Sequence, residues 1–228
     1  MWQSLVNGVI KLIEILYEIT VKIGTPSYTL AILILTVLIR LALYPLNDKQ
    51  LTSTRKLQEI QPELTKLQKK YKNNPEKMNK EMIKLYQENN VSPMGGCLPL
   101  LVQMPIIIAL FQALRQFPYT DLGATFLWVP HLKNPDPYMI LPIFVALATY
   151  FQSKVSMGNS SNQSNPQAAR TQKSMLYAMP ILVGWMSTKF PAGLCLYWIF
   201  YGLTGMIQQI FINRRSEFRK GGVGKANE

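Results

Sequence analysis

The sequence predicts an all-α polytopic membrane protein, with five transmembrane helices, an N-terminal interfacial amphipathic helix and a cytoplasmic helical hairpin. Three observations predict it: long stretches almost free of charge, basic residues gathered in alternate connections, and an arginine inside one apolar stretch. Of the 228 residues, 48% are hydrophobic and 16% are charged, values that a soluble domain can also have. The distribution of these residues along the chain therefore decides the fold class.

Five stretches of roughly 17–21 residues carry almost no charge, as a helix that rises ~1.5 Å per residue needs to cross a hydrocarbon core of ~30 Å. Short connections rich in charge, proline, asparagine or serine separate these stretches. We expect a single five-helix core over 25–213. Its predicted spans are 26–46, 96–114, 138–153, 174–190 and 194–212.

The net charge of +12 indicates how the chain is oriented in a membrane. Most lysines and arginines lie in the predicted hairpin 48–93, the loop 154–173 and the basic tail 214–228, which strict alternation of the spans places on one side. Basic residues favour the cytoplasmic side. We therefore expect these segments and the C-terminus to be cytoplasmic and the N-terminus extracytoplasmic. With the charge so explained, we expect no sequence-specific nucleic acid as a partner.

Residues 1–24 are predicted to form the interfacial helix. Polar residues recur every three or four positions between Gln3 and Lys22, so they share one face of an otherwise apolar helix. A narrow polar stripe of this kind is typical of a helix that lies in the membrane interface. A sixth span is the alternative, although three charges near its middle would be costly. We expect no cleavable signal peptide, because a basic start and a small-residue cleavage site are lacking.

Residues 48–93 form the only sizeable polar region. Apolar residues recur there every three or four positions on two helical faces, which Asn73, Asn74 and Pro75 separate. Asparagine before proline suits a helix N-cap followed by the first helical position. We expect an antiparallel hairpin in which each apolar face packs on the other. Pro62 either bends the first helix or marks where its regular part begins.

Arg40 is the most informative residue. Six apolar or aromatic residues separate it from Asn47, so it lies about 9 Å inside the cytoplasmic end of its span. In one interpretation, the guanidinium reaches the inner lipid headgroups. In the other, it lines a water-filled cavity, which Thr36 favours because it lies one turn earlier on the same face. No predicted span contains Asp or Glu, so such a cavity would receive an acidic ligand or substrate.

Other predicted spans supply polar side chains for the same cavity. The last span carries tyrosine, threonine and glutamine at helical spacing, and the second and third spans each carry a glutamine. Each of these alone is explained by an interhelical hydrogen bond, worth about 0.6 kcal/mol in membranes. Together with Arg40 they indicate a substrate groove. We assign to it Thr36, Arg40, Gln103, Gln152, Tyr197, Trp198 and Tyr201. The glycines of the last two spans indicate close helix packing instead: Gly184, Gly202 and Gly205.

Motifs for catalysis are lacking. The chain has no phosphate loop, GxSxG, HExxH or pair of intramembrane carboxylates. The single histidine, His131, excludes a metal site built from histidines. Cys97 and Cys195 do not form a CxxC pair, and we expect no structural disulfide between them. We therefore expect that the protein is not an enzyme and uses no cofactor or metal.

Two ordered motifs closely resemble the YidC/Oxa/Alb family of membrane protein insertases: GGCLPLLVQMP at 95–105 and FPAGLCLYW at 190–198. The resemblance covers nearly all of 25–213. It includes Arg40 followed by an aromatic-Pro-Leu sequence, and the glutamine pair 208–209. The chain is similar to the short Gram-positive type because it lacks a large extracytoplasmic domain, although it also lacks the lipoprotein signal that many of those proteins have.

The resemblance implies a hydrophilic groove that is open to the cytoplasm and to lipid but closed on the outer side. It assigns the groove arginine, the threonine one turn earlier and the groove aromatic to Arg40, Thr36 and Trp198. The match of Gln152 is less specific, because its local pattern permits a shift of one residue. The implied activity is insertion of nascent membrane proteins into the bacterial cell membrane without ATP.

The implied partners are nascent membrane proteins and the lipid bilayer, with the ribosome and the Sec translocon left open. The basic tail is short, which puts docking to a ribosome in doubt, and we expect the protein to act as a monomer. Two other functions stay open from the residues. One is a small-solute or anion transporter that binds at Arg40, although the internal repeats and broken helices of transporters are not evident. The other is a chaperone that folds spans without inserting them.

Overall fold

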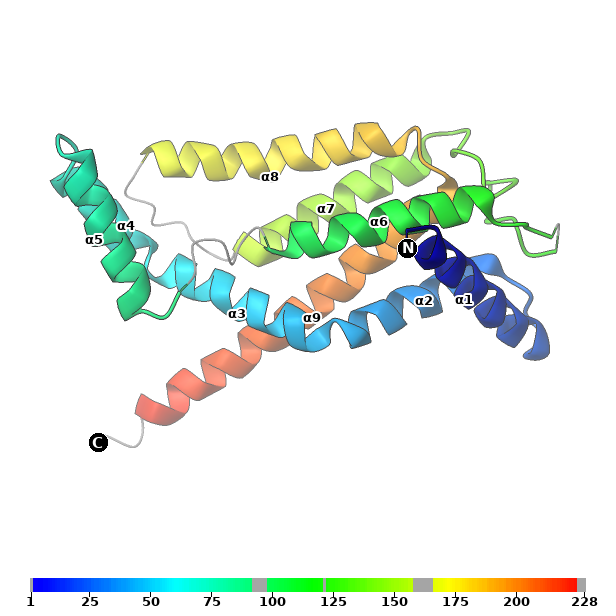
Figure 1. Cartoon of the computed structure of the whole chain (residues 1–228), viewed down its shortest axis with the longest axis horizontal. Helices are drawn as coiled ribbons and strands as arrows, with labels where there is room; N and C mark the ends of the chain where they lie inside the picture. The colour runs from blue at the N-terminus through cyan, green and yellow to red at the C-terminus, as the bar shows by residue number, and fades with distance from the viewer. Residues whose placement is uncertain (1, 92–97, 121, 158–165, 225–228) are drawn as a thin grey trace.

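The computed structural model describes residues 2–91, 98–120, 122–157 and 166–224. Its helices are α1 (Trp2–Lys22), α2 (Tyr28–Ala42), α3 (Tyr44–Glu59), α4 (Gln61–Lys70), α5 (Pro75–Glu88), α6 (Leu98–Gln116), α7 (Ile140–Met157), α8 (Pro166–Ser187) and α9 (Ala192–Gly224). In Figure 1, α2, α6, α7, α8 and α9 run along the length of the molecule, and α4 and α5 stand across one end. Within the described ranges the one pairing of β type is an isolated bridge between Phe126 and Val129. The all-α prediction is confirmed.

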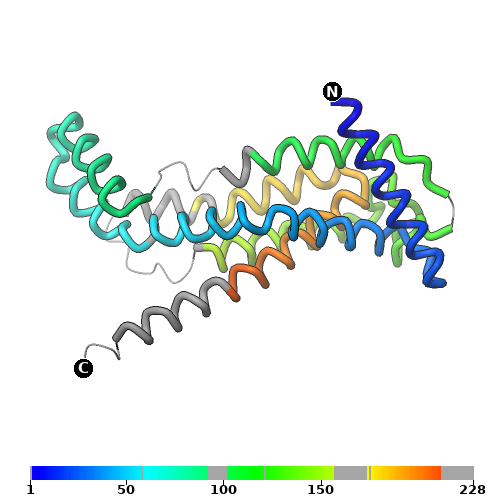
Figure 2. Tube along the Cα trace, turned by 60° about the horizontal axis from the view of Figure 1, so that its bottom comes forward, coloured from blue at the N-terminus to red at the C-terminus, as the bar shows by residue number. Residues whose placement is uncertain are grey.

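Helix α1 crosses the other helices obliquely (Figure 2). Its side chains form three faces. One face packs on α2 and α6 and buries Val6, Ile13 and Leu16. The second carries the predicted polar stripe, where Lys11 and Glu14 are exposed. A helix with separate faces for protein, water and lipid fits an interfacial position, which stays a prediction. The third face is apolar and exposed, with Leu5, Leu12, Ile15 and Ile19.

Helices α2 and α3 divide the expected first span 26–46, and they meet at an angle of 67°. The Leu43 N–H donates to the Ile39 carbonyl at 3.0 Å and ends α2. Pro45 follows in the first turn of α3. Proline has no N–H to donate to the carbonyl four residues earlier, and its ring crowds that carbonyl. The sequence predicted one span over 26–46, and the structure divides it into two helices because a proline break lies within the apolar run.

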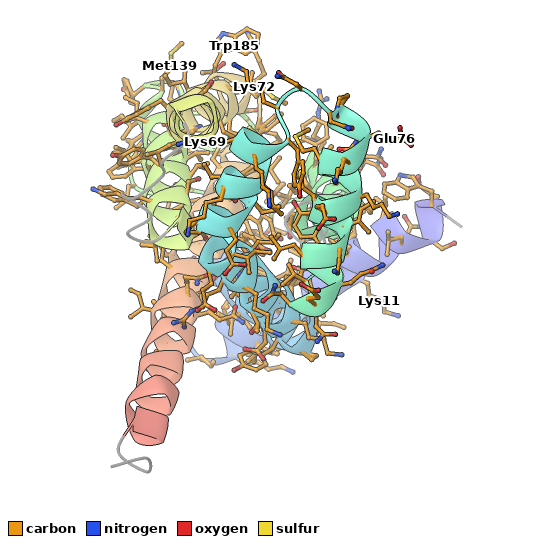
Figure 3. All side chains as sticks on the ribbon, turned by 90° about the vertical axis from the view of Figure 1, so that its left-hand side faces the viewer. Lys11, Lys69, Lys72, Glu76, Met139 and Trp185 are labelled. Carbon is orange, nitrogen blue, oxygen red and sulfur yellow. The ribbon has the colours of Figure 1, made fainter. Side chains whose placement is uncertain are left out.

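Helices α4 and α5 fold back on each other at the end of the molecule shown in Figure 3. Ile60 and Leu64 are buried against Leu85 and Val91, while Lys69, Lys72 and Glu76 are exposed. Pro62 lies in the first turn of α4, where its missing N–H costs no helical hydrogen bond. The predicted cap is confirmed, because the Asn74 side chain accepts a hydrogen bond of 3.0 Å from the Lys77 N–H.

The main hydrophobic core lies at the opposite end, where α1, α2, α6 and α9 meet the segment 117–139. Phe117 and Leu132 of this segment are almost completely buried. The rings of Tyr17 and Tyr28 stack at a centroid distance of 3.9 Å and join α1 to α2. This end of the molecule is therefore closely packed.

The described helices differ in how well they match the length of a membrane span. By length and composition one of them passes, at Ala192–Phe211, and the bent pair of α2 with Tyr44–Leu57 passes when counted as one span. Ile140–Ser156 and Leu176–Ser187 are apolar but shorter. The expected span 96–114 begins outside the described residues. The count of five spans therefore stays a prediction.

A predicted loop and the predicted tail are both more helical than expected. Helix α7 continues into the predicted loop 154–173 and α8 begins within it at Pro166, and α9 includes most of the tail 214–228. Proline suits the first position of a helix. Helices continue past an apolar stretch until a breaker ends them, which hydropathy alone does not reveal. Residues 158–165 and 225–228 of these segments lie outside the described residues, as does Cys97; Cys195 is buried and free.

Candidate functional site

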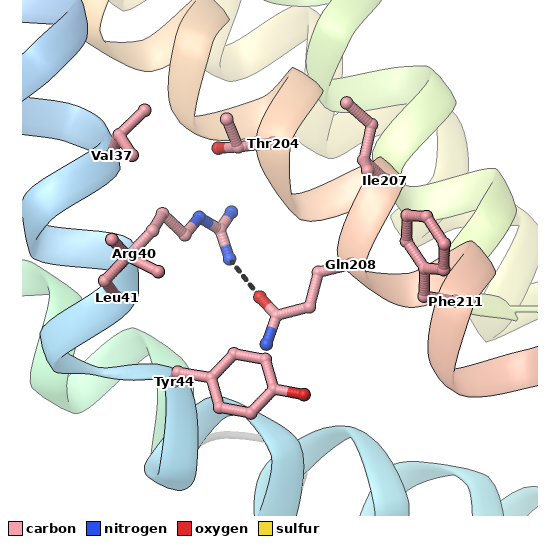
Figure 4. Close-up of a pocket in the computed structure, with 8 residues that line it drawn as sticks. All are labelled: Val37, Arg40, Leu41, Tyr44, Thr204, Ile207, Gln208 and Phe211. Carbon is pink, nitrogen blue, oxygen red and sulfur yellow. Dashed lines mark hydrogen bonds between the residues drawn. The ribbon is translucent and has the colours of Figure 1, made fainter. Parts of the chain in front are cut away.

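Arg40 lies in the last turn of α2, and its side chain reaches across to α9 (Figure 4). Its Nη2 donates a hydrogen bond to the Tyr201 carbonyl, and its Nη1 donates one of 3.4 Å to Gln208 Oε1. The guanidinium carbon lies 3.6 Å from the centroid of the Tyr201 ring. A cation over an aromatic ring contributes about 2 kcal/mol when both are desolvated. One helix therefore holds the guanidinium by three contacts.

The charge of Arg40 has no carboxylate partner in the part of the chain that the structure describes. The ion pairs found there, Arg55–Glu59 and Lys84–Glu88, lie in α3 and α5. Arg40 Nε is buried without a hydrogen-bond partner among these residues, and so is Gln208 Nε2. A buried donor without an acceptor costs about 1–3 kcal/mol, more when it is charged. The site therefore has unused capacity to donate hydrogen bonds.

Gly205 leaves the space in which Arg40 and Gln152 approach α9. A Cβ added at Gly205 would overlap Arg40 Nη2 and would lie 3.0 Å from Gln152 Nε2. Three residues earlier, a Cβ at Gly202 would lie 3.6 Å from Gln152 Oε1 and 3.4 Å from Ala148 Cβ, which are ordinary contacts. The structure thus brings the predicted third-span glutamine to the arginine, on a surface of α9 that lacks side chains.

Tyr197 and Gln103 extend this polar set into the bundle. The Gln103 Nε2 of α6 donates a hydrogen bond of 2.9 Å to the Tyr197 hydroxyl, which is almost completely buried. The rings of Tyr197 and Tyr201 stack at a centroid distance of 5.8 Å. The Gln103–Tyr197 hydrogen bond and the Tyr197–Tyr201 stack thus connect α6 to the side chains at Arg40, and the assignment of these residues to a substrate groove stays a prediction.

Thr36 and Trp198 have different surroundings from the rest of the predicted set. Thr36 is fully buried, and its hydroxyl donates to the Ile32 carbonyl at 2.7 Å, so its hydrogen is used within α2. Trp198 is half-buried and packs against the main hydrophobic core. Neither residue has a hydrogen bond to Arg40 within the part of the chain that the structure describes.

A cavity of about 500 Å³ opens between α2 and α9 beside Arg40 (Figure 4). Most of its exposed surface is apolar. At this point the expected hydrophilic groove therefore has an apolar wall. Of the described groove residues that we predicted, Arg40 alone lines it. The full lining is Val37, Arg40, Leu41, Tyr44, Thr204, Ile207, Gln208 and Phe211.

Several residues of the site were not assigned to the groove from the sequence, among them Tyr44, Gln208 and Gly205. Tyr44 follows Arg40 by four residues, and Gln208 ends the polar stripe of the last span, so both carried a usable signal. Gly205 was interpreted as a close-packing position between helices. Its neighbours are the side chains of Arg40 and Gln152, which a sequence pattern cannot reveal.

Apolar residues are widely exposed on α7, α8 and α9, including Phe144, Trp185 and Phe211. Such a surface is typical of a helical membrane protein, and the cation in a cavity between two apolar helices is its candidate polar site. The chain belongs to the family described as 60Kd inner membrane protein, whose sequence model matches residues 19–220.

The similar proteins carry the name YidC. The membrane protein insertase YidC of Clostridium perfringens is 48% identical over 188 residues, which cover 82% of this chain and 78% of that protein. That of Oceanobacillus iheyensis is 44% identical over 193 residues, covering 82% and 75%. A crystal structure of an active YidC insertase, with its first transmembrane domain resolved, superposes with a TM-score of 0.65 at 25% identity. The match covers 91% of this chain and 46% of that one, so the chain spans less than half of that protein. The resemblance seen in the sequence is confirmed.

Proposed function

We propose that the chain is a membrane protein insertase of the bacterial cell membrane. It receives hydrophilic segments of nascent membrane proteins at Arg40 and releases their apolar spans into the bilayer without ATP. The names of the relatives support insertion as the activity. The observation that carries the proposal is the guanidinium of Arg40, held in a cavity between α2 and α9 without a carboxylate from the described residues.

A substrate carboxylate enters from the cytoplasm and accepts hydrogen bonds from the Arg40 guanidinium. The planar fork of arginine matches a carboxylate, and charge-assisted hydrogen bonds are about twice as strong as neutral ones. The unused Nε donor is available for this purpose. A charge that would otherwise cross bare hydrocarbon meets a counter-ion, which lowers the barrier to its transfer by several kcal/mol.

The apolar part of the substrate then leaves sideways into lipid along α2, α7 and α9. Phe144 of α7 and Phe211 of α9 are exposed, so these helices offer the substrate an apolar path. Partition of an apolar segment into the bilayer is favourable by itself, and this step needs no nucleotide.

The hairpin of α4 and α5 is the first contact for the substrate on the cytoplasmic side. It buries few apolar residues in its own cluster and exposes Ile83, so it can bind an emerging apolar segment. The ribosome or the Sec translocon delivers that segment. The N-terminus lies outside the cell, the C-terminus lies in the cytoplasm, and one copy of the chain suffices.

Substitutions of Arg40 test the mechanism in an insertion assay with a single-span substrate that has an acidic leader. We expect Arg40→Ala and Arg40→Glu to lose insertion at least tenfold and Arg40→Lys to keep part of it, because Lys retains the charge without the fork. Arg115→Ala is the matched control, since Arg115 is exposed at the far end of α6. Full activity of Arg40→Glu would exclude attraction of acids as the mechanism.

An anion transporter is the second candidate. The break between α2 and α3 lies at Leu43, three residues after Arg40, and transporters place broken helices beside their binding sites. Anion flux into liposomes in the absence of any nascent chain would favour this candidate over an insertase.

A further inference from the structure

The cavity beside Arg40 has an apolar wall, which the binding of a hydrophilic peptide does not explain. Val37 and Leu41 of α2 face Ile207 and Phe211 of α9 across it. The volume of about 500 Å³ lies within the range of ~300–1,000 Å³ that is typical of ligand pockets. Leu41, Ile207 and Phe211 are 63%, 55% and 67% exposed, so this wall continues onto the outer surface of the bundle. The cavity is therefore open to the acyl chains of a surrounding bilayer.

The polar end of the same cavity has hydrogen-bond donors that lack acceptors, and a positive charge that lacks a counter-ion. Arg40 Nε and Gln208 Nε2 are both buried and lack an acceptor among the described residues. They belong to side chains that already touch, since Arg40 Nη1 donates to Gln208 Oε1. One group with two or more oxygens can accept from both. No carboxylate lines the cavity within the described residues, so this group carries the compensating negative charge itself.

The bend after α2 brings this polar end close to the inner membrane surface. Arg40 lies three residues before the break at Leu43, and α3 departs at 67°. The membrane-crossing part of the helix thus ends about one turn after Arg40 rather than continuing to residue 46. A headgroup of the inner leaflet can reach the guanidinium while its acyl chain stays in the apolar part of the cavity.

We propose that, between substrates, this cavity binds an anionic phospholipid from the inner leaflet. Its phosphate oxygens accept from Arg40 Nε and Gln208 Nε2, and one acyl chain lies along Val37, Leu41, Ile207 and Phe211. The proposal concerns the same cavity as the proposed function, and it adds that a substrate carboxylate displaces a bound phosphate. Lipid binding is measured without any substrate, so the two proposals fail separately.

Native mass spectrometry of the purified full chain tests this proposal, with phosphatidylglycerol and phosphatidylcholine of identical acyl chains as probes. We expect one phosphatidylglycerol to bind in preference to phosphatidylcholine. Arg40→Gln lowers its affinity about tenfold or more, because a hydrogen bond to a charged group is lost. Arg115→Gln removes an exposed arginine at the other end of the bundle and leaves the affinity unchanged.

A second variant tests the apolar wall without changing a charge. Ile207→Trp fills the cavity, and we expect it to weaken phosphatidylglycerol binding as strongly as Arg40→Gln does. Oleate and inorganic phosphate serve as competitors: oleate, with a carboxylate and a chain, displaces the lipid, whereas inorganic phosphate does not.

Equal binding of both lipids, full binding by Arg40→Gln and Ile207→Trp, or displacement by inorganic phosphate alone would each overturn the lipid site. If Arg40→Ala lost insertion while phosphatidylglycerol binding proved nonspecific, the insertase mechanism would stand and only this inference would fall. If lipid binding were specific while Arg40→Ala left insertion unaffected, the lipid site would stand and the proposed insertase mechanism would fail.

Discussion

The guanidinium of Arg40 is held by the backbone of α9 as well as by side chains. The Tyr201 carbonyl accepts from Arg40 Nη2, and it lies 3.1 Å from the Thr204 hydroxyl, whose shorter hydrogen bond of 2.7 Å goes to the Phe200 carbonyl. The approach to this carbonyl is possible because Gly205 lacks a Cβ. Tyr201 contributes its ring in addition, since the cation lies over it. Arginine position and glycine position are therefore coupled.

The variant Gly205→Ala tests this coupling. Its Cβ overlaps Arg40 Nη2, which is the far end of a flexible side chain, so we expect the guanidinium to shift and lose the Tyr201 carbonyl and insertion to fall several-fold, with little change in stability. Gly202→Ala is the matched control, because its Cβ meets Ala148 at an ordinary 3.4 Å. Thermal unfolding and the insertion assay measure both variants. Combining Gly205→Ala with Arg40→Lys gives a non-additive loss if the two positions act together. Equal behaviour of the two alanine variants would contradict the coupling.

At the scale of single residues, helical spacing predicts most of the polar set. Tyr197 and Tyr201 lie four residues apart, and the structure stacks their rings and places Arg40 over the second. Spacing cannot show which partner a side chain selects. Thr36 shares a face with Arg40, yet its hydroxyl binds the backbone of its own helix. The apolar cavity wall also escaped prediction, because lipid-facing and cavity-facing leucines have the same pattern.

At the scale of elements, apolar stretches predict where helices lie better than where they end. The stretch 138–153 became α7 at Ile140–Met157, and 194–212 became α9 at Ala192–Gly224. Both helices continue into polar sequence, because helix-breaking and capping residues determine where a helix ends and hydropathy does not. The reverse occurred at Pro45, where an apolar run contains the end of one helix and the start of the next.

Asp136 stabilises the start of α7. Its Oδ2 accepts from the Leu141 N–H at 2.6 Å, and its Oδ1 accepts from the Tyr138 N–H and from Trp128 Nε1, both at 3.1 Å. We expect Asp136→Ala to lower the free energy of unfolding by about 1–3 kcal/mol, because the helix cap and the acceptor for the half-buried Trp128 indole are lost together. Thermal unfolding followed by tryptophan fluorescence measures this. Glu18→Ala, at an exposed carboxylate of α1, serves as the control. An unchanged midpoint for Asp136→Ala would show that the carboxylate does not stabilise this end.

At the scale of the whole molecule, the two ends differ in packing. The end with the segment 117–139 contains the main core, and the end with α4 and α5 has only a small apolar cluster. The cavity at Arg40 lies between them. This asymmetry fits a protein that is closed on one side of a membrane and accessible from the other. The charge pattern of the sequence predicts which side is which.

Thiol labelling tests the predicted orientation. Single cysteines replace Lys72 of the hairpin or Lys133 of the segment 117–139, in a chain with Cys97 and Cys195 changed to alanine. Both positions are exposed. We expect a membrane-impermeant reagent to label position 133 in intact cells and position 72 only after lysis, because basic segments stay inside. Labelling of position 72 in intact cells would invert the topology.

The bend at Leu43 also affects the lipid around the chain. Helix α2 has 15 residues and is about 22 Å long, whereas the hydrocarbon core of a bilayer measures ~30 Å. Lipids next to a short apolar segment compress to match it, at a modest cost per ångström of mismatch. We therefore expect the bilayer to be thinned beside Arg40, which would shorten the path of a charged leader through the hydrocarbon core.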